Sequence, residues 1–272
     1  MNGRCIIIGG RGFVGQGVVA EAQSRGLDVC VVGRDNYDTL KGAKCDLLIN
    51  ANGNSRKYLA SQDASLDFDL SVRSVQRSLT DFVAKHYVFL SSIDVYPCVS
   101  DPTENGEETK IQPDHLSPYG FNKYIAEQLV RYHRPDALML RMGGFVGPGL
   151  WKNPIYDMLT QSPWRVHPDS AFQYLHTRDF GRILFTLLSQ GATGETINVA
   201  GDGLLSLRDI VSLIPGCSIP SQAQELDIHR YDICIDKLQH LMSVPSSRET
   251  VEAFIDDVLE DRIAIGQKET GS

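Results

Sequence analysis

The sequence predicts an α/β fold built on a parallel sheet, and three observations support this class. Short apolar runs rich in β-branched residues alternate along the chain with stretches whose apolar residues recur at helical spacing. The first run, 5–8, is followed directly by three glycines at G-x-x-G-x-x-G spacing and then by a helical stretch. The length of 272 residues allows a large core and suits one domain with a second lobe better than two independent domains.

Apolar runs bounded by polar or glycine-containing segments predict the strands. These runs occupy 5–8, 28–34, 45–50, 87–92, 137–142, 173–177, 196–200 and 231–235. The segment 35–44 is too short for a full helical crossover, so any helix there spans one or two turns. The segments 54–67 and 93–115 are polar, and the second is also rich in proline, so both are expected to be surface loops.

Apolar residues at helical spacing, together with capping signals, predict the helices. They occupy 17–25, 66–86, 117–133, 153–161, 179–189, 205–214 and 247–265. Gly26 is placed to end the first helix, and Ser117 followed by Pro118 gives the third an N-cap and a proline in its first turn. Ser206 is expected to cap the helix over 205–214.

The glycine turn after the first strand has the composition of a phosphate cradle. Gly9, Gly12 and Gly15 let the backbone approach a pyrophosphate closely, and the following helix offers free N–H groups and a partial positive charge. We therefore expect a dinucleotide at this turn; the alternative is a tight packing turn without a ligand. The expected cofactor contacts in the turn are Gly9, Arg11, Gly12, Phe13, Val14 and Gly15.

The end of the second strand indicates which dinucleotide is bound. An acidic residue there accepts a hydrogen bond from the ribose 2′-hydroxyl of NAD, whereas an arginine pairs with the 2′-phosphate of NADP. Arg34 comes first and Asp35 follows, and Arg11 in the glycine turn is a second candidate phosphate partner. NADP(H) is therefore favoured over NAD(H); the alternative for Arg34 is a solvated loop cation.

Small polar residues follow the third and fourth strands, at the carboxyl edge of the sheet where ligands bind in such folds. Asn50, Ala51 and Asn52 end the third strand, and an ordinary strand-to-loop turn explains them equally well. Ser92 ends the fourth strand and brings a hydroxyl group to the same edge.

Tyr119 and Lys123 lie one helical turn apart, on the same face of the helix over 117–133. A free phenol with a pKa of about 10 is a poor acid or base at neutral pH, and an ammonium group beside it lowers that pKa. Ser92 could hydrogen-bond the same substrate oxygen. Together the three side chains can polarise a carbonyl or deprotonate an alcohol while a nicotinamide cofactor transfers hydride.

With these features the chain resembles the extended short-chain dehydrogenase/reductases, which include NAD(P)-dependent sugar-nucleotide epimerases, dehydratases and reductases. The resemblance runs over 5–213. Its motifs are Gly9-x-x-Gly12-x-x-Gly15, Leu90-Ser-Ser-Ile-Asp-Val-Tyr-Pro97, Ser117-Pro-Tyr-Gly-Phe-Asn-Lys123, Leu140-Arg141 with Val146-Gly-Pro-Gly149, Tyr174-Leu-His-Thr-Arg-Asp179 and Ile197-Asn-Val-Ala-Gly201.

The resemblance implies a Rossmann-type doubly wound sheet with a small C-terminal substrate-binding lobe. It implies that Tyr119 is the catalytic acid/base, that Lys123 binds the nicotinamide ribose and lowers the Tyr119 pKa, and that Ser92 holds the reacting oxygen. The cofactor cleft would also be lined by Asn50, Ala51 and Asn52. The expected single domain, 1–272, has a dinucleotide-binding core mainly at 1–142 and 170–200 and a substrate lobe mainly at 143–169 and 201–265.

Differences from the family's motifs disfavour one of its reactions and alter two of its substrate contacts. Dehydratases of the family carry an Asp-Glu pair directly after the strand-end hydroxyl residue, where this chain has Ile93 and Asp94, so dehydration is disfavoured. Asp94 could act as an acid or base in epimerisation, or it could cap the loop. Two diphosphate contacts of the family are replaced by Gly144 and Phe172. The polar candidates for a substituted substrate site are Lys152, Asn153, Arg165 and His167.

The expected function is an NADP(H)-dependent oxidoreductase or epimerase that acts on a carbonyl or secondary alcohol, above all of a 4-keto nucleotide sugar. The alternative, from another class, is a regulatory or assembly protein that binds NADP(H) and has lost turnover. The intact set of Ser92, Tyr119 and Lys123 argues against that alternative. The family often dimerises through two helices, which here are 70–83 and the helix of Tyr119, so a homodimer is expected.

Composition and sequence pattern argue against several other classes of protein. A net charge of −8 argues against a nucleic-acid-binding surface. The six cysteines form no C-x-x-C pair, which favours free thiols in a reducing compartment over disulfides or a metal site. The first strand begins almost at the N-terminus, so no signal peptide is expected, and no apolar run approaches the roughly 20 residues of a membrane span. The sequence therefore predicts a cytoplasmic protein without a membrane segment.

Overall fold

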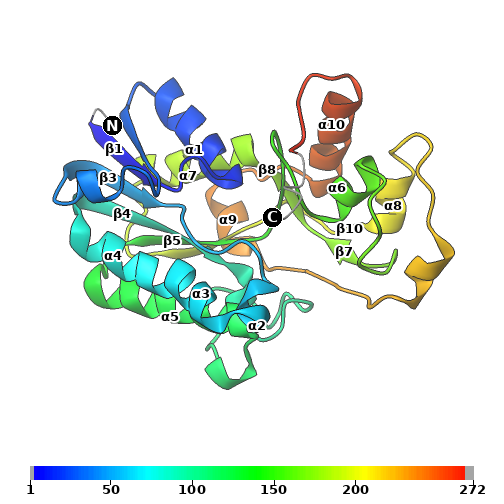
Figure 1. Ribbon diagram of the computed structural model, residues 1–272, viewed down its shortest axis with the longest axis horizontal. Helices are drawn as coiled ribbons and strands as arrows, with labels where there is room; N and C mark the ends of the chain where they lie inside the picture. The colour runs from blue at the N-terminus through cyan, green and yellow to red at the C-terminus, as the bar shows by residue number, and fades with distance from the viewer. Residues whose placement is uncertain (1–2, 267–272) are drawn as a thin grey trace.

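The computed structural model of the protein describes residues 3–266. Its centre is a parallel sheet of six strands, to the left in Figure 1. In spatial order the strands are β2 (Asp28–Val32), β1 (Arg4–Ile8), β3 (Lys44–Asn50), β4 (Val83–Ser92), β5 (Leu138–Met142) and β9 (Thr196–Val199). The chain runs outward from β1 in both directions, so the strand order reverses between β1 and β3. A crevice forms at the carboxyl ends of the strands at such a reversal.

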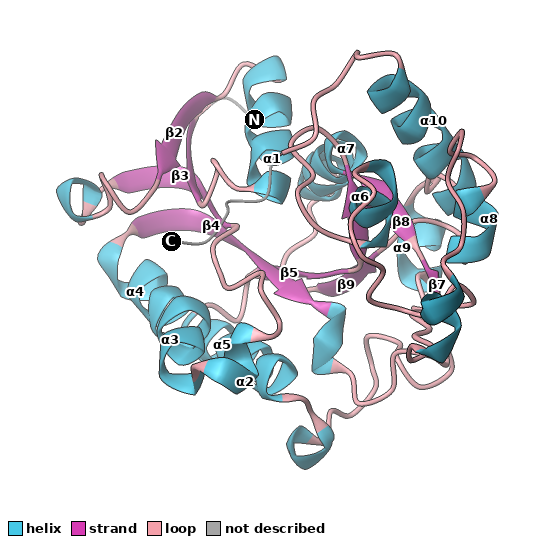
Figure 2. Ribbon diagram, turned by 45° about the vertical axis from the view of Figure 1, so that its right-hand side comes forward, coloured by secondary structure: helices cyan, strands magenta, loops and turns pink. Residues whose placement is uncertain are grey.

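Helices cover both faces of the sheet, which confirms the predicted doubly wound α/β fold (Figure 2). On one face, Cys5 and Ile7 belong to a core with α1 (Phe13–Ser24) and α7 (Thr177–Ser189). On the other face, Ile6 and Ile8 belong to a core with α4 (Ser74–Asp81) and α5 (Pro118–His133). Successive side chains of a strand point to opposite faces, so a strand with helices on both sides is apolar throughout.

The segment predicted as one helix over 66–86 is divided in the structure. It contains α3 (Ala64–Phe68), the π-helical turn η2 (Asp69–Arg73), α4 and the start of β4. The prediction was wrong beyond Asp81, because Phe82 is buried in the core beneath the sheet and Val83 already pairs with β3. The loop predicted over 54–67 also contains a short helix, α2 (Leu59–Gln62).

A lobe on the right in Figure 1 packs beside the carboxyl ends of the strands. It contains β6 (Gly144–Val146), α6 (Pro154–Leu159), β7 (Ala171–Phe172), β8 (Tyr174–His176), β10 (Leu205–Ser206), α8 (Leu207–Val211) and α10 (Ser247–Leu259). Strand β6 pairs with β8, and β7 pairs with β10. The lobe has an apolar core of its own, which includes Tyr156, Ile210 and Phe254. The residue boundaries proposed above for the core and the lobe stay predictions.

The strand predicted over 231–235 does not form. The N–H of Ile233 donates to Oε1 of Gln173, and the N–H of Cys234 donates to Oδ1 of Asn105. Side chains therefore satisfy these backbone groups where a neighbouring strand was expected. The next residues form α9 (Asp236–Leu241), a helix that the sequence analysis did not predict.

Helix caps were predicted more accurately than helix ends. The side chains of Ser117 and Ser206 accept hydrogen bonds from the first turns of α5 and α8, as expected. Helix α8, however, ends at Val211, and α10 ends at Leu259, both earlier than predicted. Short 3₁₀ helices complete the fold: η1 (Asp38–Leu40), η3 (Ile93–Val95), η4 (Pro113–His115) and η5 (Ser221–Glu225).

None of the helices within residues 3–266 has the length and apolar character needed to cross a membrane. The same residues contain no group of three or more His, Cys, Asp or Glu side chains arranged to hold a metal ion. All six cysteines are free thiols.

Candidate active site

A cavity of about 1670 Å³ lies at the carboxyl ends of the strands, between the sheet and the lobe. The predicted site residues that line it are Gly9, Arg11, Gly12, Phe13, Val14, Gly15, Arg34, Ala51, Asn52, Ser92, Asp94, Tyr119, Lys123, Lys152, Asn153 and Arg165. Two further candidates, Asn50 and His167, do not line it. The fold thus brings motifs that are far apart in the sequence to one cavity.

The glycine turn at one wall of this cavity is too tight for side chains. A Cβ atom on Gly15 would lie 2.2 Å from the carbonyl oxygen of Gly9, and a Cβ atom on Gly12 would lie 3.1 Å from the same oxygen. Helix α1 begins at Phe13, earlier than predicted, and no side chain caps its N-terminal residue Gly12. The prediction began too late because glycine lowers helix propensity. The first amides of α1 therefore have no side-chain acceptor at the cavity wall.

The end of β2 presents one free cation and one ion pair. Arg11 and Asp35 are both exposed and form an ion pair with 2.8 Å between Nη1 and Oδ1. The hydrogen bond from Arg11 lowers the pKa of Asp35. Arg34 lines the cavity, is exposed, and has no ion-pair partner among residues 3–266.

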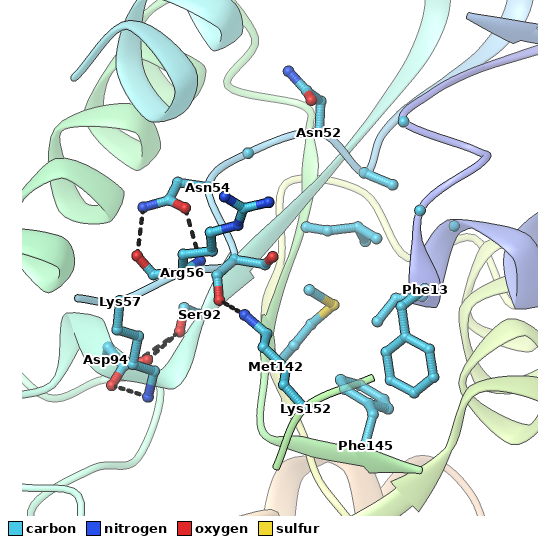
Figure 3. Close-up of a pocket in the computed structure, with 18 of the residues that line it drawn as sticks. Phe13, Asn52, Asn54, Arg56, Lys57, Ser92, Asp94, Met142, Phe145 and Lys152 are labelled. Atoms are coloured by element: carbon cyan, nitrogen blue, oxygen red, sulfur yellow. Dashed lines mark hydrogen bonds and ion pairs between the residues drawn. The ribbon is translucent and has the colours of Figure 1, made fainter. Parts of the chain in front are cut away.

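The residues after β3 divide between the cavity and the core. Ala51 and Asn52 line the cavity, with Asn52 at the top of Figure 3. Asn50 is completely buried, and its amide nitrogen donates to Ser78 Oγ at 2.9 Å and to the Tyr87 hydroxyl at 3.1 Å. Its amide oxygen accepts from the N–H of Asn52 at 3.0 Å. Asn50 therefore stabilises the turn after β3 from its buried side. It does not line the cavity, although this had been expected.

Tyr119 lies in the first turn of α5 and is buried at the cavity wall. Burial and then the charge of Asp94 raise the pKa of Tyr119, while Lys57 and a hydrogen bond with Ser92 oppose this shift. The lowering expected from Lys123 is not found; its amine lies 5.9 Å from the centre of the Tyr119 ring. The phenol is therefore protonated at neutral pH in this structure.

Lys123 is a largely buried residue whose amine faces the cavity. Its side chain is 5% exposed, and it has no hydrogen-bond or ion-pair partner among the described residues. Burial lowers the pKa of Lys123 to about 8, against the opposing charges of Asp67, Asp94 and Glu127. Gly53 lies over this amine, and its φ of 153° is a backbone conformation that favours glycine.

Ser92, Asp94 and Lys57 form a chain of short hydrogen bonds (Figure 3). All three of these residues influence the pKa of Tyr119. Ser92 Oγ donates to one carboxylate oxygen of Asp94 at 2.7 Å, and the Lys57 amine donates to the other at 2.7 Å. The same amine lies 3.3 Å from the Tyr231 hydroxyl. Sequence analysis missed Lys57, because it lies in a polar segment without a motif and only its charge distinguishes it.

Asp67 is a second charged residue that the sequence analysis missed. It is completely buried at the end of α3, where it accepts from Nδ2 of Asn54 at 2.6 Å and from Nδ2 of Asn122 at 2.7 Å. Asn122 directly precedes Lys123 on α5, and the Asp67 charge raises the pKa of that lysine. Asp67 thus helps to keep the unpartnered Lys123 amine protonated.

The three candidate substrate residues of the lobe differ in how their side chains lie relative to the cavity. Asn153 lines the cavity, but its side chain caps α6 by accepting from the N–H of Tyr156 at 2.8 Å. Arg165 lines the cavity and is exposed. His167 lies outside the cavity, where its Nδ1 accepts from the N–H of Asp169 at 3.1 Å. Of these three residues, only Arg165 presents an exposed side chain at the cavity.

Residues 5–200 match the sequence profile of the NAD dependent epimerase/dehydratase family. The chain belongs to this family. A comparison with curated protein sequences finds no match. The family assignment confirms the resemblance on which the sequence analysis relied, and it rests on the same segment as the glycine turn, Ser92 and the α5 motif.

Solved structures of related fold cover nearly the whole chain. A UDP-galactose 4-epimerase is 21% identical with a TM-score of 0.75, covering 95% of this chain and 99% of its own. A dTDP-4-dehydrorhamnose reductase from Bacillus anthracis, in complex with NADP, is 16% identical with a TM-score of 0.74, covering 94% and 99%. A UDP-glucuronic acid 4-epimerase from Bacillus cereus, in complex with UDP-glucuronic acid and NAD, is 16% identical with a TM-score of 0.74, covering 94% and 99%.

The cavity of this family member has features that fit a nicotinamide dinucleotide. The glycine turn leaves backbone amides at a wall where a Cβ atom would clash. The Lys123 amine reaches the cavity from a largely buried residue and has no hydrogen-bond or ion-pair partner among the described residues, so it is available to a ligand there. A ribose hydroxyl of a bound cofactor is a suitable acceptor for this amine.

Proposed function

We propose that this protein is an NADP(H)-dependent enzyme that interconverts a carbonyl and a secondary alcohol on a nucleotide-linked sugar. One observation carries the proposal: Ser92, Tyr119 and the unpartnered Lys123 amine line the same cavity as the glycine turn. An acid, a hydrogen-bonding hydroxyl group and a cation at the cavity that the glycine turn also lines support this proposal. A binding protein without turnover has no need of all three groups.

Each of the three side chains has a distinct role in the proposed reaction. Ser92 and Tyr119, which hydrogen-bond each other, hold the reacting oxygen of the substrate. Tyr119 donates or removes the proton on that oxygen, and the bound nicotinamide supplies or accepts hydride. Lys123 positions the cofactor through its ribose. The protein thereby orients both reactants and controls one proton.

The raised pKa of Tyr119 suits its phenol to act as a proton donor to a substrate oxygen, a step that a reductase and an epimerase both need. Burial and Asp94 raise the pKa of Tyr119, so the phenol carries its proton at neutral pH. A protonated phenol can neutralise the alkoxide that forms when hydride reaches a carbonyl carbon. A reductase uses one NADPH in each turnover, whereas an epimerase retains and recycles the cofactor.

Asp94 is better suited to positioning Ser92 than to acid/base chemistry of its own. Both of its carboxylate oxygens accept hydrogen bonds, one from Ser92 and one from Lys57. These two bonds orient the carboxylate toward Ser92 and Lys57. Ile93 and Asp94 also stand where the family's dehydratases carry their Asp-Glu pair, so we place the reaction among reductions and epimerisations.

Arg34 is expected to select NADP(H) over NAD(H). The substitution Arg34→Gln should weaken NADPH binding by roughly tenfold or more, because a charge-assisted bond to the 2′-phosphate is lost. It should leave NADH binding nearly unchanged, since NADH has no 2′-phosphate. Asp35, which could otherwise accept from an NAD ribose, is engaged by Arg11. Quenching of protein fluorescence by each cofactor measures both affinities.

Arg182→Gln is the matched control for this prediction, since Arg182 lies on α7 outside the cavity and pairs with Asp179. An equal loss of NADPH and NADH affinity in Arg34→Gln would show that Arg34 stabilises the turn and does not select the cofactor.

The proposed function is tested by NADPH oxidation in the presence of a panel of 4-keto nucleotide sugars. Turnover of any member supports the proposal. Binding of NADPH with neither oxidation of the cofactor nor epimerisation of any panel member would favour a regulatory or assembly protein. Mass spectrometry of the nucleotide that copurifies separates the two catalytic forms, because an epimerase holds its cofactor tightly and a reductase releases it.

Homodimerisation through α4 and α5 and a cytoplasmic location stay predictions.

A further inference from the structure

Lys57 is held at the cavity wall by two partners from distant parts of the chain. Its amine donates to one carboxylate oxygen of Asp94 at 2.7 Å and lies 3.3 Å from the Tyr231 hydroxyl. The amine also lies 4.8 Å from the centre of the Tyr231 ring, which is within the range of a cation–π contact. Asp94 follows β4 of the sheet, whereas the backbone N–H of Tyr231 donates to β7 of the lobe. The sheet and the lobe therefore both hold this amine.

The carboxylate of Asp94 connects the amine to the hydroxyl groups assigned to the reaction. Its second oxygen accepts from Ser92 Oγ at 2.7 Å (Figure 3), and Ser92 in turn hydrogen-bonds Tyr119. A single carboxylate group thus separates the Lys57 amine from Ser92. Burial and then the charge of Asp94 raise the pKa of Tyr119, and the charge of Lys57 lowers it. The two charges of this ion pair therefore act on the phenol in opposite directions.

Lys57 is the cation whose charge lowers the pKa of Tyr119 in this structure. The sequence analysis gave that role to Lys123, but the Lys123 amine lies 5.9 Å from the centre of the Tyr119 ring and the lowering is not found. Partial burial lowers the pKa of Lys57, but the charge of Asp94 raises it by more, so the amine is charged at neutral pH. Tyr119 is also influenced by Asp67 of α3, whose charge raises its pKa.

We propose that Lys57 is a positioning residue for the proton of Tyr119: its charge stabilises the phenolate that forms when Tyr119 gives this proton to the substrate oxygen. The inference rests on the proposed function, which supplies the substrate oxygen. The proton moves from the Tyr119 hydroxyl to the alkoxide, and the phenolate recovers a proton from water after the product leaves. A buried negative charge is costly, and a nearby cation reduces that cost.

The ionisation of Tyr119 tests this inference without substrate or cofactor. Tyr119 is replaced by difluorotyrosine, because ring fluorine lowers the pKa of a phenol and brings its titration into the pH range where the protein stays folded. Fluorine NMR follows the titration in the labelled protein and in its Lys57→Met and Asp94→Asn variants. We expect the midpoint to rise by about one pH unit in Lys57→Met and to fall by about the same amount in Asp94→Asn. Lys57→Arg, which keeps the charge, should titrate close to the labelled protein.

The matched controls are Lys110→Met and Asp114→Asn, which remove the same charges from exposed positions outside the cavity. Both should titrate as the labelled protein does. Opposite shifts in the two cavity variants cannot come from lost packing, because lost packing does not depend on the sign of the charge removed. The inference is overturned if Lys57→Met leaves the midpoint unchanged, if both cavity variants move it in the same direction, or if Lys123→Met raises it more than Lys57→Met does.

Failure of the proposed function gives a different result from failure of this inference. Opposite shifts in a protein that turns over no nucleotide sugar of the panel would retain the interaction of Lys57 with Tyr119 and remove the reaction. In a protein that does turn over, Lys57→Met should lower the turnover number by roughly three- to tenfold, because Tyr119 becomes a weaker acid, and leave NADPH affinity nearly unchanged. Weaker NADPH binding with an unchanged turnover number would assign Lys57 to the cofactor and overturn the inference.

Discussion

Replacing Tyr119 with phenylalanine is expected to reduce the turnover number by about 10²–10⁴-fold, the usual contribution of a positioned acid or base. The substitution keeps the buried ring and removes only the hydroxyl group that hydrogen-bonds Ser92. Cofactor affinity should change little, because the amine assigned to the ribose belongs to Lys123. NADPH oxidation at saturating cofactor and substrate measures the loss, and NADPH binding is measured on the same preparation.

The loss in Tyr119→Phe must come from chemistry and not from unfolding. Removing a hydroxyl group from a buried ring leaves its packing intact, so the melting temperature of Tyr119→Phe should stay close to that of the wild type. Tyr132→Phe, at an 83% exposed position on the same helix, is the matched control and should retain full activity. Equal activity of Tyr119→Phe and the wild type would remove Tyr119 from the reaction.

Replacing Glu127 with alanine is expected to lower the free energy of unfolding by about 3–5 kcal/mol, the cost of leaving a buried charge without its partner. Glu127 and Arg141 are almost completely buried, and two nitrogens of Arg141 donate to the two carboxylate oxygens at 2.9 and 2.8 Å. Ser91 donates to the same carboxylate at 2.7 Å, and Arg141 also donates to the Tyr96 hydroxyl at 2.8 Å. Urea unfolding of wild type and variant measures the difference.

The double variant Glu127→Leu with Arg141→Met separates the lost charge pair from lost packing. Replacing both buried charges with apolar side chains of similar volume is often close to neutral, so this variant should recover much of the stability lost in Glu127→Ala. A loss below about 1 kcal/mol in Glu127→Ala would mean that the carboxylate is not buried as the structure places it.

The same ion pair supports the site above it. Ser91, which donates to Glu127, directly precedes Ser92 on β4, and Glu127 lies one helical turn after Lys123 on α5. The pair therefore fixes β4, β5 and α5 relative to one another where they end at the cavity. A weakened pair should also misplace Ser92 and Lys123.

Local patterns predicted those parts of the fold that depend on neighbouring residues. The glycine turn, the serine caps of α5 and α8, and the strands β1, β2, β3 and β5 each follow from a short run of suitable residues. The end of the helix before β4 depends on a distant partner, since Val83 is extended because it pairs with Lys44 on β3. Helical periodicity over 66–86 contains no information about that pairing.

The residues of the candidate site also fall into two groups, those found from local motifs and those that only the tertiary structure brings together. Tyr119, Lys123 and Ser92 belong to motifs, so they could be found before the fold was known. Lys57 and Asp67 are charged residues in a polar segment, and only the tertiary structure brings Lys57 to Asp94 and Asp67 to Asn122. Asn50 shows the reverse case, because its place at a strand end suggested the cleft while its side chain points into the core.

A crystal structure of the protein with NADP⁺ tests the central claim most directly. We predict the pyrophosphate at the glycine turn of Gly9 to Gly15, the 2′-phosphate at Arg34, and a ribose hydroxyl on the Lys123 amine. The nicotinamide ring should lie beside Tyr119, leaving space for a substrate carbon about 3.5 Å from the ring carbon that carries hydride. A dinucleotide bound elsewhere, or one whose nicotinamide lies away from Tyr119 and Lys123, would contradict the proposed site.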